Sequence, residues 1–197
     1  CDTSKYLYEA EKAGKNIMFE AQLGALRDID FGIFPYTSSS SSNAGYACVG
    51  AGIPGSHVDR TVGIVKAYST CVGEGPFTAE WFGEEAEQLR VAGAEYGAAT
   101  GRPRRVGPID LVATRYGCRI QGATEVALTK LDVLSYMKEI PVCAQYEVNG
   151  EKTDDFPVTA VIDEAKPVLT TVPGWGCDIS GVRKYEDLPQ AARDYVE

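Results

Sequence analysis

The sequence predicts an α/β fold with a mostly parallel sheet, flanking helices and an added antiparallel hairpin. Apolar runs of strand length alternate along the chain with longer segments of helical periodicity, a pattern typical of parallel sheets. Late in the chain, an Asn-Gly pair at 149–150 separates two strand-like runs and signals a hairpin. Neither a repeat nor a linker interrupts residues 1–197, so a single α/β domain is expected.

The first half of the chain is predicted to contain few regular elements. Ser4 can cap a first helix and Gly14 can end it. The letters "NIMFEA" indicate a buried strand, and a turn-rich region follows them. The expected elements are a helix at 4–13, a strand at 16–21, a helix at 57–65 and a strand at 65–70.

The second half is predicted to be richer in helices and strands. Gly93 can end one helix, while Pro108 and Pro189 suit the first turns of two others. Ligands of α/β sheets bind at the carboxyl ends of strands, so residues that follow strands are the first site candidates. The expected elements are helices at 83–93, 108–120 and 186–197, strands at 124–130 and 166–175, and a hairpin at 142–156.

The composition argues against several classes of protein. A net charge of −9 disfavours binding to a nucleic-acid polymer, because phosphate attraction requires a basic face. No apolar run approaches the roughly 20 residues that span a bilayer, and the first residues do not resemble a secretion signal. The six scattered cysteines are expected to be reduced, buried thiols of a cytoplasmic protein, without a zinc site. The chain lacks an initiator Met and ends within a predicted helix, so it is expected to be a piece of a longer protein.

The segment "TEVALTKLDVL", residues 124–134, changes abruptly from apolar to polar at Thr129. After a buried strand, the Asp132 carboxylate could accept two N–H groups from a guanine edge, while the stem of Lys130 covers the base. The same letters also fit the polar end of an ordinary strand. On these residues alone, both interpretations stay open.

Arg102, Arg104 and Arg105 lie together in the loop "ATGRPRRVG" (99–107). Arginine forks bind carboxylates and phosphates, so the cluster is either an anion site or a hub of structural ion pairs. The Ser-rich run at 37–43 is either a flexible linker or a phosphate-binding loop. Its aromatic and Gly-rich neighbours favour a ligand loop.

The segment "GAGIPG" (50–55) matches the glycine pattern of a dinucleotide-binding turn. A NAD-dependent oxidoreductase is therefore one alternative, which needs the preceding "YACV" to be a strand and a helix to follow. A non-catalytic nucleotide-binding module is another. His57, the only histidine, lies in a Gly/Pro-rich turn without an obvious nucleophile, so we expect it at the surface.

Several longer segments match one known family in a single register. "DIDFGIFPYTSS", "EYGAATGRPRRVG", "LTKLDVL" and "DISGVRKYEDLPQAARDYV" closely resemble adenylosuccinate synthetase, and the resemblance runs from about Lys15 to the C-terminus. It implies part of a larger P-loop-like, GTP-dependent ligase fold of AMP biosynthesis. It also implies IMP, L-aspartate and GTP as substrates, Mg²⁺ as cofactor and a homodimeric complete enzyme. The isolated chain is expected to be inactive, because the family's phosphate loop, catalytic Asp and catalytic His lie in an N-terminal portion absent here.

The resemblance further implies roles for individual residues. No catalytic residue and no metal ligand is expected within the chain, and Mg²⁺ would be held mainly by GTP and the N-terminal portion. Leu23 occupies the position of a Gln that contacts the reacting 6-oxygen of IMP, and Gln22 is the candidate substitute. The implied ligand residues are Lys130, Asp132 and Arg104 for GTP, Thr100, Arg102 and Arg104 for aspartate, and Ser38, Val72 and Arg102 for IMP.

Overall fold

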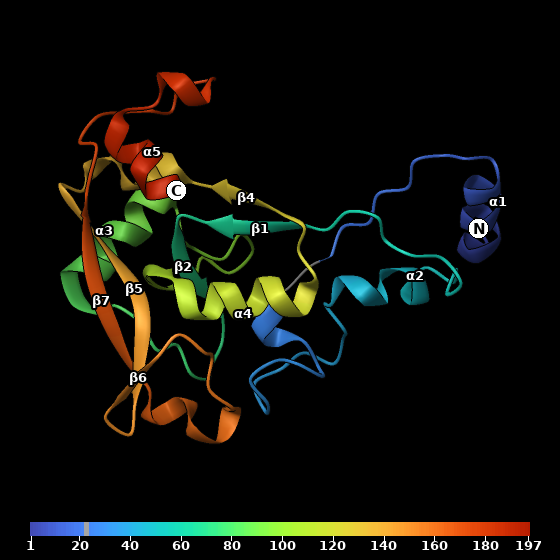
Figure 1. The fold of residues 1–197 in the computed structure, drawn as a ribbon, viewed down its shortest axis with the longest axis horizontal. Helices are drawn as coiled ribbons and strands as arrows, with labels where there is room; N and C mark the ends of the chain where they lie inside the picture. Colours follow the sequence, from blue (N-terminus) through green and yellow to red (C-terminus); the bar gives the residue numbers. More distant parts are fainter. Residues whose placement is uncertain (22–23) are drawn as a thin grey trace. The chain divides into compact units, whose positions relative to one another are not determined.

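The computed structural model describes residues 1–21 and 24–197 and contains both helices and strands (Figure 1). The α-helices are α1 (Thr3–Lys12), α2 (Ala47–Gly50), α3 (Gly83–Gly93), α4 (Leu111–Gln121) and α5 (Gln190–Val196). The strands are β1 (Val62–Lys66), β2 (Tyr68–Cys71), β3 (Arg105–Asp110), β4 (Glu125–Thr129), β5 (Glu139–Val148), β6 (Glu151–Thr153) and β7 (Lys166–Pro173). Short 3₁₀ helices occur at Ala25–Arg27, Ala44–Tyr46, Leu131–Tyr136, Thr159–Glu164 and Tyr185–Asp187.

The chain forms two compact units. Unit 1 comprises Cys1–Gly63 and Tyr116–Val126, and unit 2 comprises Ile64–Arg115 and Ala127–Glu197. The single α/β domain expected from the sequence stays a prediction.

A mixed sheet organises unit 2. Its strand order is β2-β3-β5-β6, with β7 paired along β5, and β1 pairs separately with β4. Strands β3 and β5 run parallel, whereas β2–β3, β5–β6 and β5–β7 are antiparallel. The long strands β5 and β7 lie side by side in Figure 1. The α/β class is confirmed, and the expectation of a mostly parallel sheet is corrected. The hairpin turn at Asn149–Gly150 makes β6 antiparallel to β5, and β7 pairs antiparallel along the other edge of β5. Strands β2 and β3 are also antiparallel, although the helix α3 lies between them in the chain.

The core of unit 2 lies between its sheet and α3. Tyr68, Leu89, Leu134 and Ile140 are almost completely buried within one apolar cluster. Ala79, Val112, Cys143 and Tyr146 form a second, smaller cluster. Removing such side chains from water is the main favourable term in folding, so these clusters fix the strand ends that carry the polar residues described below.

Most predicted elements are confirmed, within a few residues at their ends. The α1 helix begins one residue early, and Asp2 rather than Ser4 caps it, by accepting the Lys5 N–H at 3.0 Å. Elements α3, β4, β7, α5 and the β5–β6 hairpin lie where the sequence predicts them. The chain has no helix, among the residues that the structure covers, that is long and apolar enough to cross a bilayer.

Three predictions of local structure were wrong. Residues 16–21 are not a strand, and Met18 is 93% exposed, because an apolar run becomes a strand only where a neighbour pairs with it and covers it. Residues 57–65 are not helical, since β1 begins at Val62. Pro108 belongs to β3, where it pairs opposite Tyr68, and the following helix begins only at Leu111.

Candidate functional site

A cavity of about 350 Å³ lies at the carboxyl end of β4 in unit 2. Its volume is near the lower end of the range for small-molecule sites, which suits a ring system better than a whole nucleotide. We call it the β4 cavity. Its lining comprises Leu128, Lys130, Leu131, Asp132, Ile179, Ser180, Val182 and Leu188.

The two polar residues of "TKLD" differ in their environment. Asp132 is exposed, and within the described part of the chain its carboxylate has no hydrogen bond or ion pair. Lys130 adopts a left-handed backbone conformation with φ 58°, which is uncommon for a residue with a side chain. Its ammonium donates to the Gly93 carbonyl at 2.6 Å and lies 3.2 Å from a Glu95 oxygen. The anchored ammonium leaves the apolar stem of Lys130 to line the cavity.

Glu95 is the hub of a buried ion network. Its carboxylate, which is 0% exposed, accepts hydrogen bonds from Lys66 at 2.8 Å, Tyr68 at 2.6 Å and Arg104 at 2.8 Å, besides the contact with Lys130. Burial raises the pKa of Glu95, but the hydrogen bonds from Lys66, Tyr68 and Arg104 outweigh it and lower the pKa to about 2. Glu95 is therefore ionised at neutral pH.

The arginine-rich segment forms a closed loop, residues 95–104, which we call the Arg loop. At its base, the Arg104 N–H donates to the Glu95 carbonyl at 2.9 Å, and the two side chains are paired as well. Higher up, the Gly97 N–H donates to the Arg102 carbonyl at 2.8 Å. Thr100 and Arg102 are exposed at the tip. Within the described residues, the Arg102 guanidinium makes no ion pair, so this cation is available to a ligand.

Arg105 has a different environment from Arg102. Its guanidinium pairs with Glu80 and also donates to the carbonyls of Gly73 and Gly75. These bonds hold the loop that follows β2, which begins at the 71% exposed Val72. Of the three clustered arginines, Arg105 is thus a structural ion-pair residue, while Arg102 and Arg104 remain candidates for anion binding.

The Ser-rich run in unit 1 is an ordered loop. The buried Asp28 carboxylate accepts the backbone N–H groups of Ser42 at 2.7 Å and Asn43 at 3.1 Å. Burial raises the pKa of Asp28, but hydrogen bonds from the backbone of Phe31, Asp30 and Ser42 have the larger combined effect. The pKa of Asp28 is therefore lowered from its usual value. The half-buried Ser38 accepts the Ser40 N–H at 3.0 Å in a local turn. The linker interpretation is therefore wrong.

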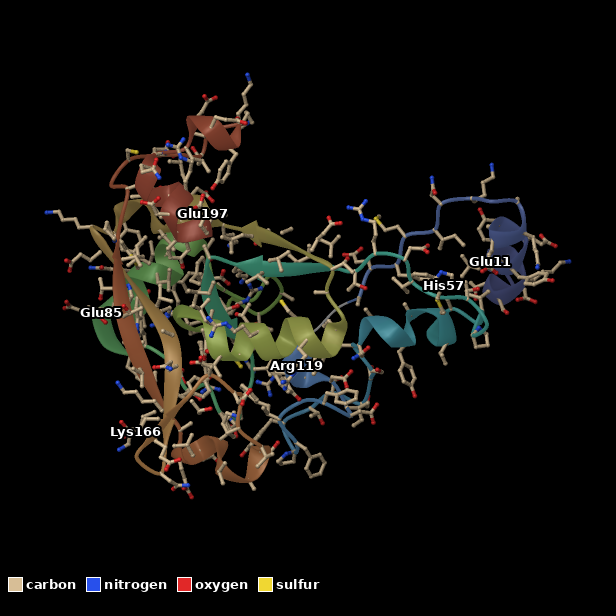
Figure 2. The ribbon with its side chains drawn as sticks, in the orientation of Figure 1. Glu11, His57, Glu85, Arg119, Lys166 and Glu197 are labelled. Atoms are coloured by element: carbon tan, nitrogen blue, oxygen red, sulfur yellow. The ribbon has the colours of Figure 1, made fainter. Side chains whose placement is uncertain are left out.

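The remaining motifs do not form sites. "GAGIPG" follows the short helix α2, the segment "YACV" is helical and not a strand, and no helix follows before β1, so the context of a dinucleotide-binding turn is absent. His57 lies near Glu11 of α1 in unit 1 (Figure 2), and its side chain is 86% exposed beside Asp59, as expected of a surface residue. Gln22 and Leu23 lie outside the described residues.

The thiols match the prediction in part. Cys48 and Cys143 are buried, but Cys1 and Cys177 are exposed, and Cys71 and Cys118 are only partly buried.

The sequence patterns did not identify the buried carboxylates of Glu95 and Asp28, or the part that Ile179 and Ser180 play in the β4 cavity. Glu95 follows Ala94 and Asp28 lies between Arg27 and Ile29, and the only available signal was their position within segments that match a family. Ile179 and Ser180, which line the β4 cavity, belong to the family-like segment "DISGVRKYEDLPQAARDYV". They lie about 50 positions along the chain from "TKLD", so nothing local connects them with the cavity.

Together, the mixed sheet, the cavity at a strand end and the cation-rich loop define an α/β protein suited to an anionic, ring-containing ligand. Comparisons with known proteins are more specific. The family profile described as adenylosuccinate synthetase matches residues 1–197. The chain belongs to the adenylosuccinate synthetase family, which confirms the resemblance found in the sequence.

Individual relatives show the same relation. The adenylosuccinate synthetase of Bifidobacterium adolescentis is 48% identical over 197 residues, which are 100% of this chain and 46% of that protein. That of Salinibacter ruber is 48% identical over 196 residues, 99% of this chain and 45% of that protein. The solved structure of fully ligated adenylosuccinate synthetase from Plasmodium falciparum matches with a TM-score of 0.94 and 35% identity, covering 100% of this chain and 47% of that one. The chain thus spans less than half the length of these relatives.

Proposed function

We propose that this chain is the part of an adenylosuccinate synthetase that reads the guanine of GTP and carries the loop that binds aspartate. In the reaction, the 6-oxygen of IMP takes the γ-phosphoryl group of GTP, and GDP leaves. The aspartate amine then displaces that phosphate at carbon 6, giving adenylosuccinate. The observation that carries the proposal is the exposed Asp132 carboxylate at the β4 cavity, which has no hydrogen bond or ion pair among the described residues, in a chain that belongs to this family.

The β4 cavity is the proposed guanine pocket. Asp132 accepts the N1–H and 2-amino N–H groups of guanine, a pair of donors that adenine lacks. The stem of Lys130 covers the ring while its ammonium stays on Glu95. Arg104 adds positive charge towards GTP from the base of the Arg loop.

The tip of the Arg loop is the proposed aspartate site. Thr100 and Arg102 are exposed there, and Arg104 lies at the base, so the loop presents a hydroxyl and two guanidinium groups to two carboxylates. Arg102 also contacts IMP, together with Val72 beside the ribose and Ser38 near the phosphate of IMP. The available guanidinium of Arg102 supports this assignment.

Mg²⁺ is proposed to bind mainly to the GTP phosphates and to residues outside this chain. Mg²⁺ prefers carboxylate and phosphate oxygens. In the part of the chain that the structure describes, no group of three or more His, Cys, Asp or Glu residues could hold a metal ion. The donors therefore do not fit a protein-held site here, and no step is assigned to a metal ligand of this chain. Cytoplasmic location and a homodimeric complete enzyme are part of the same proposal.

The test uses a chimeric enzyme, in which this chain replaces the matching residues of the Bifidobacterium adolescentis protein. Incubated with IMP, aspartate, GTP and Mg²⁺, the chimeric enzyme should form adenylosuccinate and GDP, and omission of any one component should stop the reaction. The 197-residue chain alone should be inactive, because positioned phosphate and metal contacts supply most of the rate of phosphoryl transfer. A folded chimeric enzyme that binds GTP without turnover would instead support a non-catalytic nucleotide-binding module.

A further inference from the structure

Four segments of unit 2 meet at the Glu95 carboxylate. Lys66 comes from the end of β1, Tyr68 from the start of β2, Arg104 from the end of the Arg loop and Lys130 from the residue after β4. Two of these four, Arg104 and Lys130, are the ligand-binding cations proposed above. Glu95 therefore connects the guanine pocket with the aspartate loop through direct contacts.

This cluster contains more positive charges than are needed to neutralise one carboxylate. Three cations contact one carboxylate, at 2.8, 2.8 and 3.2 Å. Burial lowers the pKa of Lys66, and the charges of Lys130 and Arg104 lower it further, against the opposing effect of Glu95. A buried ion pair by itself is weak evidence for stability, because desolvation offsets much of the attraction. The crowding of cations is better explained by a role in which their positions matter.

The backbone around Glu95 is shaped to bring it into the interior. Helix α3 ends at Gly93, and its C-cap residue Ala94 adopts a left-handed conformation with φ 51° although it is not glycine. A side chain at Gly93 would overlap the Tyr68 hydroxyl, so glycine is required there for Tyr68 to reach Glu95. The Gly93 carbonyl also accepts the second bond of the Lys130 ammonium. The left-handed backbone at Ala94 and the glycine at position 93 are thus both needed to place the Glu95 carboxylate among its partners.

We propose that Glu95 is a positioning residue, which fixes Lys130 and Arg104 in one geometry and thereby couples guanine binding to aspartate binding. The inference rests on the proposed function and deepens it. Glu95 touches neither substrate. It acts through the two cations, holding Lys130 beside the β4 cavity and Arg104 at the base of the Arg loop.

The test is Glu95→Gln in the chimeric enzyme, with KM measured separately for each substrate. The amide keeps the shape but removes the charge, so the KM values for GTP and for aspartate should both rise by roughly 10-fold or more, and that for IMP much less. Glu125→Gln is the control for the same change in an exposed ion pair, because Glu125 accepts three hydrogen bonds from Arg60 and none from a proposed ligand residue. The control should leave all three KM values unchanged.

A double-mutant cycle separates positioning from general destabilisation. With Lys130→Met already present, Glu95→Gln should raise the KM for GTP little further, since its effect runs through Lys130. Tyr68→Phe provides a milder perturbation should Glu95→Gln not fold, because it removes one hydrogen bond to Glu95 and keeps the packing. It should raise the KM values for GTP and aspartate in parallel, by about 3-fold, as expected for one lost hydrogen bond.

The outcomes are distinguishable from failure of the proposed function. If the unmutated chimeric enzyme makes no adenylosuccinate, the proposed function fails. If it is active but Glu95→Gln or Tyr68→Phe behaves like the control, or if the GTP effects of Glu95→Gln and Lys130→Met simply add, the positioning role is overturned.

Discussion

The Ser-rich loop of unit 1 and the Arg loop of unit 2 are each organised by one buried carboxylate, but the partners of that carboxylate differ. Asp28 accepts mainly backbone N–H groups, those of Asp30, Phe31, Ser42 and Asn43. Glu95 accepts side-chain donors, three of them cations.

The difference separates two ways of preparing a ligand loop. Hydrogen bonds to backbone amides fix the conformation of the main chain. The orientation of the hydroxyl side chains in that loop then follows from the main-chain conformation. Bonds to cationic side chains fix the charged groups themselves, while the tip of the Arg loop stays exposed. Loss of Asp28 should therefore change the shape and stability of its loop, whereas mutations at the Arg loop tip should change binding alone.

The largest effect within this comparison is expected for Arg102→Leu in the chimeric enzyme. Arg102 is exposed and makes no ion pair among the described residues, so its loss should alter stability by no more than about 0.5 kcal/mol. Loss of a charge-assisted contact to substrate should reduce kcat/KM for aspartate by about 2–5 kcal/mol of transition-state stabilisation. Steady-state kinetics and thermal unfolding of the same preparation measure both quantities. Unchanged aspartate kinetics would remove Arg102 from the proposed site.

A smaller effect, on stability, is expected for Asp28→Ala. The variant leaves the buried Ser42 N–H and the partly buried Asn43 N–H without their acceptor, which costs about 1–3 kcal/mol in local stability. Hydrogen exchange of the Ser42 and Asn43 amides in the 197-residue chain should therefore speed up relative to wild type. Asp2→Ala, which removes only the cap of α1, is the control and should leave these two amides unaffected.

The same carboxylate predicts a pH dependence of exchange. Because the folded-state pKa of Asp28 is lowered from about 3.8, its contribution to stability is fully present above about pH 3.8 and is lost as the pH falls through the folded-state value. After correction for intrinsic exchange, wild-type protection of these amides should decline below about pH 3.8, and Asp28→Ala should lack that step. A step of equal size in both proteins would show that Asp28 does not hold the loop.

Local sequence patterns predicted much of the fold, and the reasons for the failures are specific. The α3 helix and the β5–β6 hairpin follow from strong local signals, namely helix formers closed by Gly93 and the Asn149–Gly150 turn. Strand direction failed because it depends on which strands pair, and the antiparallel β5–β7 contact joins segments about 25 residues apart. The strand expected at 16–21 failed because its apolar side chains have no partner sheet.

The ligand roles of the candidate site residues stay predictions, and their arrangement followed from the sequence only in part. "TKLD" and the Arg loop were recognised, because a motif is local and retains its signal in sequence. Glu95 was missed, because its importance arises only where β1, β2, the Arg loop and the residue after β4 meet. The sequence allowed the three arginines to be either structural ion-pair residues or anion-binding residues. Arg105 forms a structural ion pair with Glu80, whereas Arg102 makes no ion pair among the described residues.

The central claim, that the β4 cavity reads guanine through Asp132, is tested most directly by Asp132→Asn in the chimeric enzyme with GTP and XTP as competing substrates. Xanthine keeps the N1–H group but carries a carbonyl where guanine has the 2-amino group, so an Asn amide matches xanthine and places donor against donor with guanine. Once the bound base shields the exposed Asp132 position from water, mismatched hydrogen bonds discriminate by up to ~10⁴-fold, so the variant should lose GTP use and gain XTP use. If Asp132→Asn still prefers GTP with near-normal kinetics, Asp132 is only the polar end of a strand.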